Sequence, residues 1–430
     1  MIDVKDPVAR VRASLRDPLI VNSSLILSTT LLMAVAGSLF WVIAARLSTP
    51  GQIGVASSLV STTEALAVFA QLGLNITLIR TMPTSDRRAS DVVAAVTVVS
   101  CFGAVLALAY GSALPWISPA VSEVVSWPGT VPMFAILVAA TAVNQLTDGI
   151  FLSINRVISN LHINGLLMSV AKIGLPFGLA GAGAFGIFGA VGLSALVAAV
   201  TSLVVILRYL PDRPTRRPSQ ALRDSLRFSG AGYVSNVLYF VPQLVLPVLI
   251  INAQGPAQSA VYFISFQIVT LLNAAVYAVS NSMFAEAARA PHAARMITRK
   301  AGRTIMVATA VGAILLVLVS PALLGIFGPE YADQGVPILR ILALGSLGVA
   351  FNYWAAILLR IANHLTAMVA VQAVTTGVMV GLGALVAPWG IEYVAASWGV
   401  GQLLGGVIGY AVSRTIAPII DLPVPTEGTP

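Results

Sequence analysis

Residues 185–207 read FGIFGAVGLSALVAAVTSLVVIL, a run without a charged side chain that ends at Arg208. A helix of about 20 apolar residues crosses the hydrocarbon core of a bilayer and satisfies its own backbone hydrogen bonds there. Similar runs recur along the 430 residues, of which 57% are hydrophobic and only 9% are charged. Soluble proteins carry about a quarter charged residues. The sequence therefore predicts a multi-pass membrane protein and excludes soluble two-domain folds and disulfide scaffolds.

The apolar runs predict an all-α polytopic fold with twelve transmembrane helices. The predicted spans are 20–45, 53–79, 91–114, 131–153, 161–183, 185–208, 229–252, 257–284, 304–327, 336–359, 365–388 and 391–413. This division places every Lys and Arg except Arg46, Lys172 and Arg340 on one side of the bilayer. Because cytoplasmic loops carry an excess of Lys and Arg, both termini are predicted to be cytoplasmic. The formal charge of +8 is then a result of topology, and no nucleic-acid partner is expected.

The chain divides into two halves at its longest hydrophilic stretch. We predict an N-terminal six-helix lobe (1–210), a cytoplasmic basic linker (211–228), a C-terminal six-helix lobe (229–414) and a disordered tail (415–430). Transporters are often built from internal repeats. An offset of 206 residues places 48–52 (STPGQ) over 254–258 (QGPAQ), which indicates such a repeat.

Polar side chains form stripes on helices at equivalent places in the two halves. In the second span they are Ser57, Ser61, Glu64, Gln71 and Asn75, and at the repeat offset the eighth span carries Gln267, Thr270, Tyr277 and Asn281. The seventh span adds Ser229, Asn236 and Gln243. Hydrogen bonds between membrane helices are one interpretation. We favour a water-filled central cavity between the two lobes, because a polar cargo requires an inward-facing polar lining.

Three ionisable residues fall inside the predicted helices: Glu64, Asp148 and Lys172. Each mid-span charge costs about 2.5–3.5 kcal/mol on insertion scales. One hypothesis pairs Lys172 with Asp148 or Glu64 in a structural ion pair, and the other makes Glu64 a coupling-ion or proton site. Arg46 either snorkels to the interface or contacts an anion at the mouth of the cavity, since guanidinium binds phosphate oxygens well.

A family resemblance follows from residues 37–48 (GSLFWVIAARLS), Gly54, residues 71–74 (QLGL) and Ile79-Arg80. This pattern resembles the polysaccharide flippase branch (Wzx-type O-antigen and capsule exporters) of the multidrug/oligosaccharidyl-lipid/polysaccharide exporter superfamily. The resemblance implies a central cavity bounded by helices 1, 2, 7 and 8, alternating access, and a polyprenyl-pyrophosphate-linked oligosaccharide as cargo. The expected cavity residues are Arg46, Ser61, Glu64, Gln71, Asn75, Asn236, Gln243, Gln267, Tyr277 and Asn281.

Other functions fit less well. A drug/cation antiporter or another carrier of a soluble solute remains the alternative, although the basic signature expected of major-facilitator carriers between helices 2 and 3 is absent. An enzyme is not expected, because no outer loop is rich in acid-base residues, and neither a cofactor nor a metal ligand set is predicted. We expect a bacterial cytoplasmic membrane protein whose partners are the lipid bilayer, the lipid-linked glycan and polysaccharide-assembly proteins.

Overall fold

The computed structural model describes residues 18–416 except for 126–128, 213, 216–218, 221, 223–229, 290–293 and 363. Within these residues every regular element is helical. The first half comprises α2 (Pro18–Leu47), α3 (Pro50–Ala70), α4 (Leu74–Thr81), α5 (Arg88–Ile117), α6 (Pro119–Val125), α7 (Thr130–Ser153), α8 (Val157–Asn160), the π-helix η1 (Leu161–Leu167), α9 (Met168–Leu179), the 3₁₀-helix η2 (Ala180–Ala182) and α10 (Gly183–Tyr209). The second half comprises α12 (Gly230–Gln254), α13 (Pro256–Arg289), α14 (Ala294–Phe327), α15 (Pro329–Ile361), α16 (Leu365–Val386), the 3₁₀-helix η4 (Ala387–Trp389) and α17 (Ile391–Ile416).

The helices fall at the twelve predicted spans, which confirms the all-α polytopic fold. Their lengths and compositions suffice to cross a membrane, and the 53-residue apolar stretch Val157–Tyr209 contains two passages. These passages meet at Gly183, whose φ of 67° lies in the left-handed region that favours glycine. The predicted disordered tail (415–430) lies outside the described residues except for 415 and 416.

The repeat offset is visible in where the helices begin. Both α3 and α13 begin at a proline, Pro50 and Pro256, which are 206 residues apart. Proline suits the first helical position because its missing N–H would have no partner there. At α3 the start is fixed further by a capping box, in which Thr49 and Gln52 satisfy each other's backbone N–H groups.

The two lobes share a core at one end of the bundle and have separate cores at the other. We call the end where α2 begins and where the α4–α5 and α10–α12 connections lie the basic end, and the end where α3 and α13 begin the opposite end. One apolar cluster joins residues of both halves, for example Phe40 and Ile53 with Ile250 and Phe263. Toward the basic end the first lobe has its own cluster, which includes Leu78, and the second lobe has a small separate one around Val276. The lobes are therefore joined mainly toward the opposite end.

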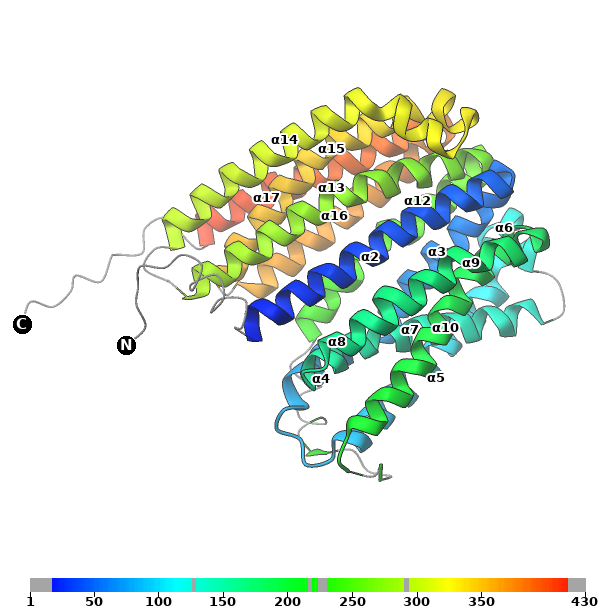
Figure 1. Cartoon of the computed structure of the whole chain (residues 1–430). Coiled ribbons are helices and arrows are strands. Elements are labelled where there is room, and N and C mark those ends of the chain that lie inside the picture. Colours follow the sequence, from blue (N-terminus) through cyan, green and yellow to red (C-terminus); the bar gives the residue numbers. More distant parts are fainter. Residues whose placement is uncertain are drawn as a thin grey trace, which may run out of the picture.

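Contacts between the lobes are also uneven around the bundle. Helix α3 packs closely against both α12 and α13, whereas α2 makes only slight contact with α13 and α14. Figure 1 shows α2 lying between the two groups of helices. Only 22% of the apolar window of α2 is buried, and its closest neighbours are α9 and η1 of the first half.

Part of the predicted linker is docked on the basic end of the first lobe. Asp91, fully buried at the start of α5, accepts hydrogen bonds from the backbone N–H (2.7 Å) and hydroxyl (2.7 Å) of Ser219. Ser85 donates a third at 2.6 Å. Asp212 accepts from the Ala89 N–H at 2.9 Å. The first part of the linker is therefore fixed to the lobe that precedes it.

Candidate transport cavity

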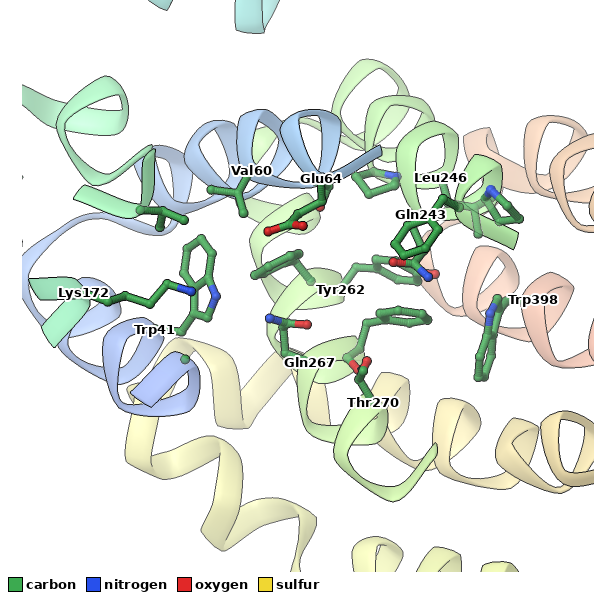
Figure 2. A pocket seen from close by; sticks show the side chains of 18 residues that line it. Trp41, Val60, Glu64, Lys172, Gln243, Leu246, Tyr262, Gln267, Thr270 and Trp398 are labelled. Carbon is green, nitrogen blue, oxygen red and sulfur yellow. The ribbon is translucent and has the colours of Figure 1, made fainter. Parts of the chain in front are cut away.

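A cavity of about 260 Å³ lies between the two halves of the chain. Its walls come from α2, α3, α9 and α10 of the first half and from α12, α13 and α17 of the second. Figure 2 shows side chains from both halves extending into this space. The lining residues are Gly37, Trp41, Val60, Ser61, Glu64, Lys172, Val191, Phe240, Pro242, Gln243, Leu246, Pro247, Tyr262, Phe263, Phe266, Gln267, Thr270 and Trp398.

The lining follows the internal repeat. Each of the five lining residues on α2 and α3 has a counterpart 206 positions later in the sequence that also lines the cavity. These pairs are Gly37 with Gln243, Trp41 with Pro247, Val60 with Phe266, Ser61 with Gln267 and Glu64 with Thr270. The same face of each repeat therefore lines the cavity. Four of the expected cavity residues, Ser61, Glu64, Gln243 and Gln267, lie on this wall.

Charge breaks this symmetry, because both charged lining residues belong to the first lobe. The repeat equivalents of Glu64 and Lys172 are Thr270 and Val378, which are uncharged. In Figure 2 the Lys172 and Glu64 side chains reach toward the same space from different helices.

The predicted ion pair of Lys172 is wrong as a direct contact. Among the described residues the salt bridge within 4 Å is that of Arg87 with Asp86, and no carboxylate lies that close to Lys172. Both candidate carboxylates accept hydrogen bonds from amides. Gln145 donates to Glu64 at 2.7 Å, and Asn164 donates to Asp148 at 2.7 Å. The Lys172 ammonium and the Glu64 carboxylate therefore line the same cavity and interact electrostatically without forming a direct salt bridge.

Glu64 begins a chain of polar side chains that leads away from the cavity. The Gln145 amide that donates to Glu64 accepts in turn from the Gln71 side chain at 2.7 Å. Gln145 comes from α7, so the chain links α3 to the interior of the first lobe. Such bonds hold the Glu64 carboxylate in place while it lines the cavity.

Gln71 and Asn75, which the sequence predicts in the lining, are not among the residues that line this cavity. The continuous helix expected over 53–79 is interrupted, because Leu72 and Gly73 both have positive φ, 49° and 77°. This break ends α3 at Ala70 and starts α4 at Leu74 in a new direction. Gln71 then bonds to Gln145, and the Asn75 side chain packs against Gly149.

Asp148 lies inside the first lobe, away from the cavity lining. Its carboxylate accepts from Asn164, whose amide also donates to Asn160 at 2.6 Å. Asn164 belongs to η1, a π-helical segment, and such segments often occur at functional sites. The sequence did not predict this segment.

The remaining expected cavity residues lie elsewhere. Asn236 and Tyr277 are exposed and lie toward the basic end from the lining. The side chain of Asn281 is outside the described part of the structure.

Arg46 joins the two lobes at the opposite end. Its Nε donates to the Ile326 carbonyl and its Nη2 to the Gly325 carbonyl, both at 3.0 Å. These acceptors are in the last turn of α14, where carbonyls lack helical partners and a positive charge is favourable. In this conformation the exposed Arg46 side chain contacts the second lobe, and its role at the mouth of the cavity stays a prediction.

Two further contacts close the opposite end. The Asn252 amide of α12 donates to the Ile117 carbonyl of α5 at 2.7 Å. At the start of α3, Gly54 lies directly against the backbone of Pro256, and an added Cβ would overlap its carbonyl. Only glycine permits so close an approach of the two helices.

A family model described as polysaccharide biosynthesis protein matches residues 43–334, a segment that contains the closed end and most of the cavity lining. The chain belongs to this polysaccharide biosynthesis family. No functionally curated protein matches the sequence.

Solved structures of transporters have the same fold. An inward-facing multidrug resistance MATE family transporter of the MOP superfamily superposes with a TM-score of 0.69 at 15% identity, over 89% of this chain and 94% of that one. An outward-facing MATE family transporter gives 0.58 at 16% identity, over 93% and 97%. A MOP superfamily transporter from Pyrococcus furiosus gives 0.57 at 17% identity, over 93% and 97%. The chain thus has the MOP transporter fold of a multi-pass membrane protein.

Sequence reasoning missed the aromatic part of the lining. Trp41, Tyr262, Phe263, Phe266 and Trp398 all face the cavity. A signal was present, since Phe263 precedes Thr270 by seven residues and shares its helix face. Aromatic residues are common in apolar spans, and this signal alone does not separate cavity from lipid.

Proposed function

We propose that this protein is a flippase that moves a polyprenyl-pyrophosphate-linked oligosaccharide or polysaccharide precursor across the bacterial cytoplasmic membrane by alternating access. In this proposal the basic end faces the cytoplasm, and the described conformation is open toward it. The shared core toward the opposite end supports this orientation of the opening. So does the higher similarity to the inward-facing than to the outward-facing neighbour.

The observation that carries the proposal is the Lys172 ammonium at the cavity wall, which makes no direct salt bridge with a carboxylate of the described residues. A charge inside a membrane is costly unless it faces water or an opposite charge. A diphosphate supplies that opposite charge, and Lys is a common binder of phosphate. The Tyr262 side chain also lines the cavity, and its buried hydroxyl has no hydrogen-bond partner among the described residues. In this proposal the hydroxyl becomes a second donor for a phosphate oxygen when the cargo is bound.

The slight contact of α2 with α13 and α14 supports a cargo that carries a lipid tail. The headgroup of such a cargo needs a polar cavity, because burying a charged diphosphate in hydrocarbon is far more costly than burying an amide. The prenyl chain belongs in the lipid. We propose that the cargo enters sideways beside α2, so that both conditions are met at once.

A drug or cation antiporter is the second candidate. The Glu64 carboxylate and the aromatic lining favour it, since aromatic faces attract organic cations. The two candidates differ in which of the opposed charges, Lys172 or Glu64, contacts the cargo.

Flipping in liposomes tests the proposal. Purified protein is reconstituted with undecaprenyl-pyrophosphate-GlcNAc, and an external galactosyltransferase with UDP-galactose modifies the sugars that reach the outer leaflet. We expect that, with the wild-type protein, the galactosyltransferase modifies the lipid-linked sugars of both leaflets. Lys172→Met should slow flipping about ten- to a hundredfold, the value of a lost charged hydrogen bond, while Lys172→Arg retains most activity. Unchanged flipping in Lys172→Met would contradict the role of the lysine. Uptake of tetraphenylphosphonium without flipping would favour the antiporter.

A further inference from the structure

Three tyrosines form a cluster on the second lobe that the cavity lining does not include. The Tyr353 ring of α15 lies 6.3 Å from the Tyr239 ring of α12 and 5.6 Å from the Tyr277 ring of α13, both in edge-to-face geometry. We call these three residues the tyrosine platform. Tyr277 is 54% exposed and Tyr239 is 37% exposed. Tyr239 and Tyr277 therefore remain partly exposed after packing.

The helical register places Tyr239 and Tyr277 toward the space between the lobes. Tyr277 follows the cavity-lining Thr270 by seven residues, and Tyr239 precedes the cavity-lining Leu246 by seven. Residues seven apart share one face of a helix. At 1.5 Å per residue the displacement along each helix is about 10 Å. The platform therefore continues the second-lobe wall of the cavity toward the basic end.

Polar groups surround the platform. Asn236 is exposed one turn before Tyr239 on α12. The side-chain amide oxygen (Oδ1) of Asn273, one turn before Tyr277 on α13, is buried and has no hydrogen-bond partner among the described residues. None of these residues carries a charge. A surface that only contacted lipid tails would gain nothing from amides and phenol hydroxyls, which cost free energy in hydrocarbon.

We propose that the tyrosine platform is a subsite for the sugar rings of the cargo, a step that rests on the proposed function. A pyranose has C–H groups on its faces and hydroxyls at its edge. The negative face of an aromatic ring attracts the polarised C–H groups, and the phenol and amide groups bond to the hydroxyls. The separation of about 10 Å from Thr270 allows the diphosphate to lie at Lys172 while the sugars extend along the platform toward the basic end.

Binding measurements with two probes test this subsite. Detergent-purified full-length protein is titrated with undecaprenyl pyrophosphate and with undecaprenyl-pyrophosphate-GlcNAc. We expect wild type to bind the sugar-bearing lipid more tightly. The double variant Tyr239→Leu/Tyr277→Leu should lose about 2- to 10-fold of affinity for the sugar-bearing lipid only, and Tyr239→Phe/Tyr277→Phe should retain most of it. The control is Tyr393→Leu, since Tyr393 is 53% exposed at the opposite end.

The outcomes separate the two proposals. Equal wild-type affinity for both lipids, or an unchanged sugar preference in the leucine double variant, would overturn the platform and leave the flippase proposal intact. Equal losses for both lipids would also overturn it, because the tyrosines would then act on the whole site. Failure of wild type to bind either lipid would overturn the flippase proposal and the platform with it.

Discussion

Adding one methyl group at Gly54 should push the two lobes apart at the opposite end. In Gly54→Ala the new Cβ would lie 2.6 Å from the carbonyl carbon of Pro256, whereas ordinary contact begins at 3.4 Å. The obstructing atoms are backbone, so no side-chain rotation relieves the overlap. The carbonyl oxygen of Pro256 lies closer still, so the helices must part by more than 0.8 Å at this point. Overpacking of this kind costs about 1–3 kcal/mol, and the cost falls only on the conformation closed here. We expect the equilibrium to shift about 5- to 150-fold toward the conformation open at the opposite end.

Double electron–electron resonance between two spin labels measures this shift. Spin labels are attached at Trp116→Cys in the first lobe and Asp333→Cys in the second, both exposed, in a Cys101→Ala background. Gly54→Ala should populate a longer distance. The matched control is Gly51→Ala, in the same first turn of α3, where an added Cβ meets nothing within 4 Å. Identical distance distributions for Gly54→Ala and Gly51→Ala would refute the reasoning, provided that both variants keep the wild-type thermal midpoint within a few degrees.

Three further substitutions test other parts of the account. In Glu64→Gln the new amide oxygen should still accept the hydrogen bond from Gln145, so we expect a thermal midpoint near that of wild type. Flipping in liposomes should be impaired, because the variant has no titratable carboxylate. Normal flipping would reject a coupling role for the carboxylate. Arg46→Gln removes a charge and two donors from the last turn of α14, and the spin-label distance should shift in the same direction as in Gly54→Ala but only about two- to fivefold. No shift would mean that Arg46 does not hold the lobes together. Asp91→Asn turns one buried acceptor into a donor facing Ser219, which should cost about 1–3 kcal/mol and lower the thermal midpoint. The same change at the exposed Asp86 should leave the midpoint unchanged. Equal midpoints for the two variants would show that the contact between the linker and the first lobe contributes no stability.

The twelve spans could be predicted because the length of an apolar segment can be read from the residues of that segment alone. The main differences are at helix ends. α14 begins at Ala294 and not at 304, because a basic segment outside the apolar region can still be helical. The repeat offset was also readable, since the prolines that start α3 and α13 mark the same position in each half.

The site was predictable only where helices are regular. Ser61 and Gln267 lie on the cavity wall because helix periodicity carries one face along α3 and α13. Gln71 and Asn75 do not, because two residues of positive φ redirect the chain after Ala70. The pairing of Lys172 could not be read from the sequence. The sequence places Lys172 and the two carboxylates within helices, but it does not reveal that the carboxylates accept hydrogen bonds from Gln145 and Asn164.

Photocrosslinking tests most directly whether the cavity carries a lipid-linked glycan. Benzoylphenylalanine is placed at Gln267 on the cavity wall and, as a control, at Val105 of α5, which is 59% exposed. We predict that radiolabelled undecaprenyl-pyrophosphate-GlcNAc crosslinks at position 267 and is displaced by the unlabelled lipid, with little crosslinking at position 105. Crosslinking at position 267 no greater than at position 105, or displacement by tetraphenylphosphonium but not by the unlabelled lipid, would contradict the account.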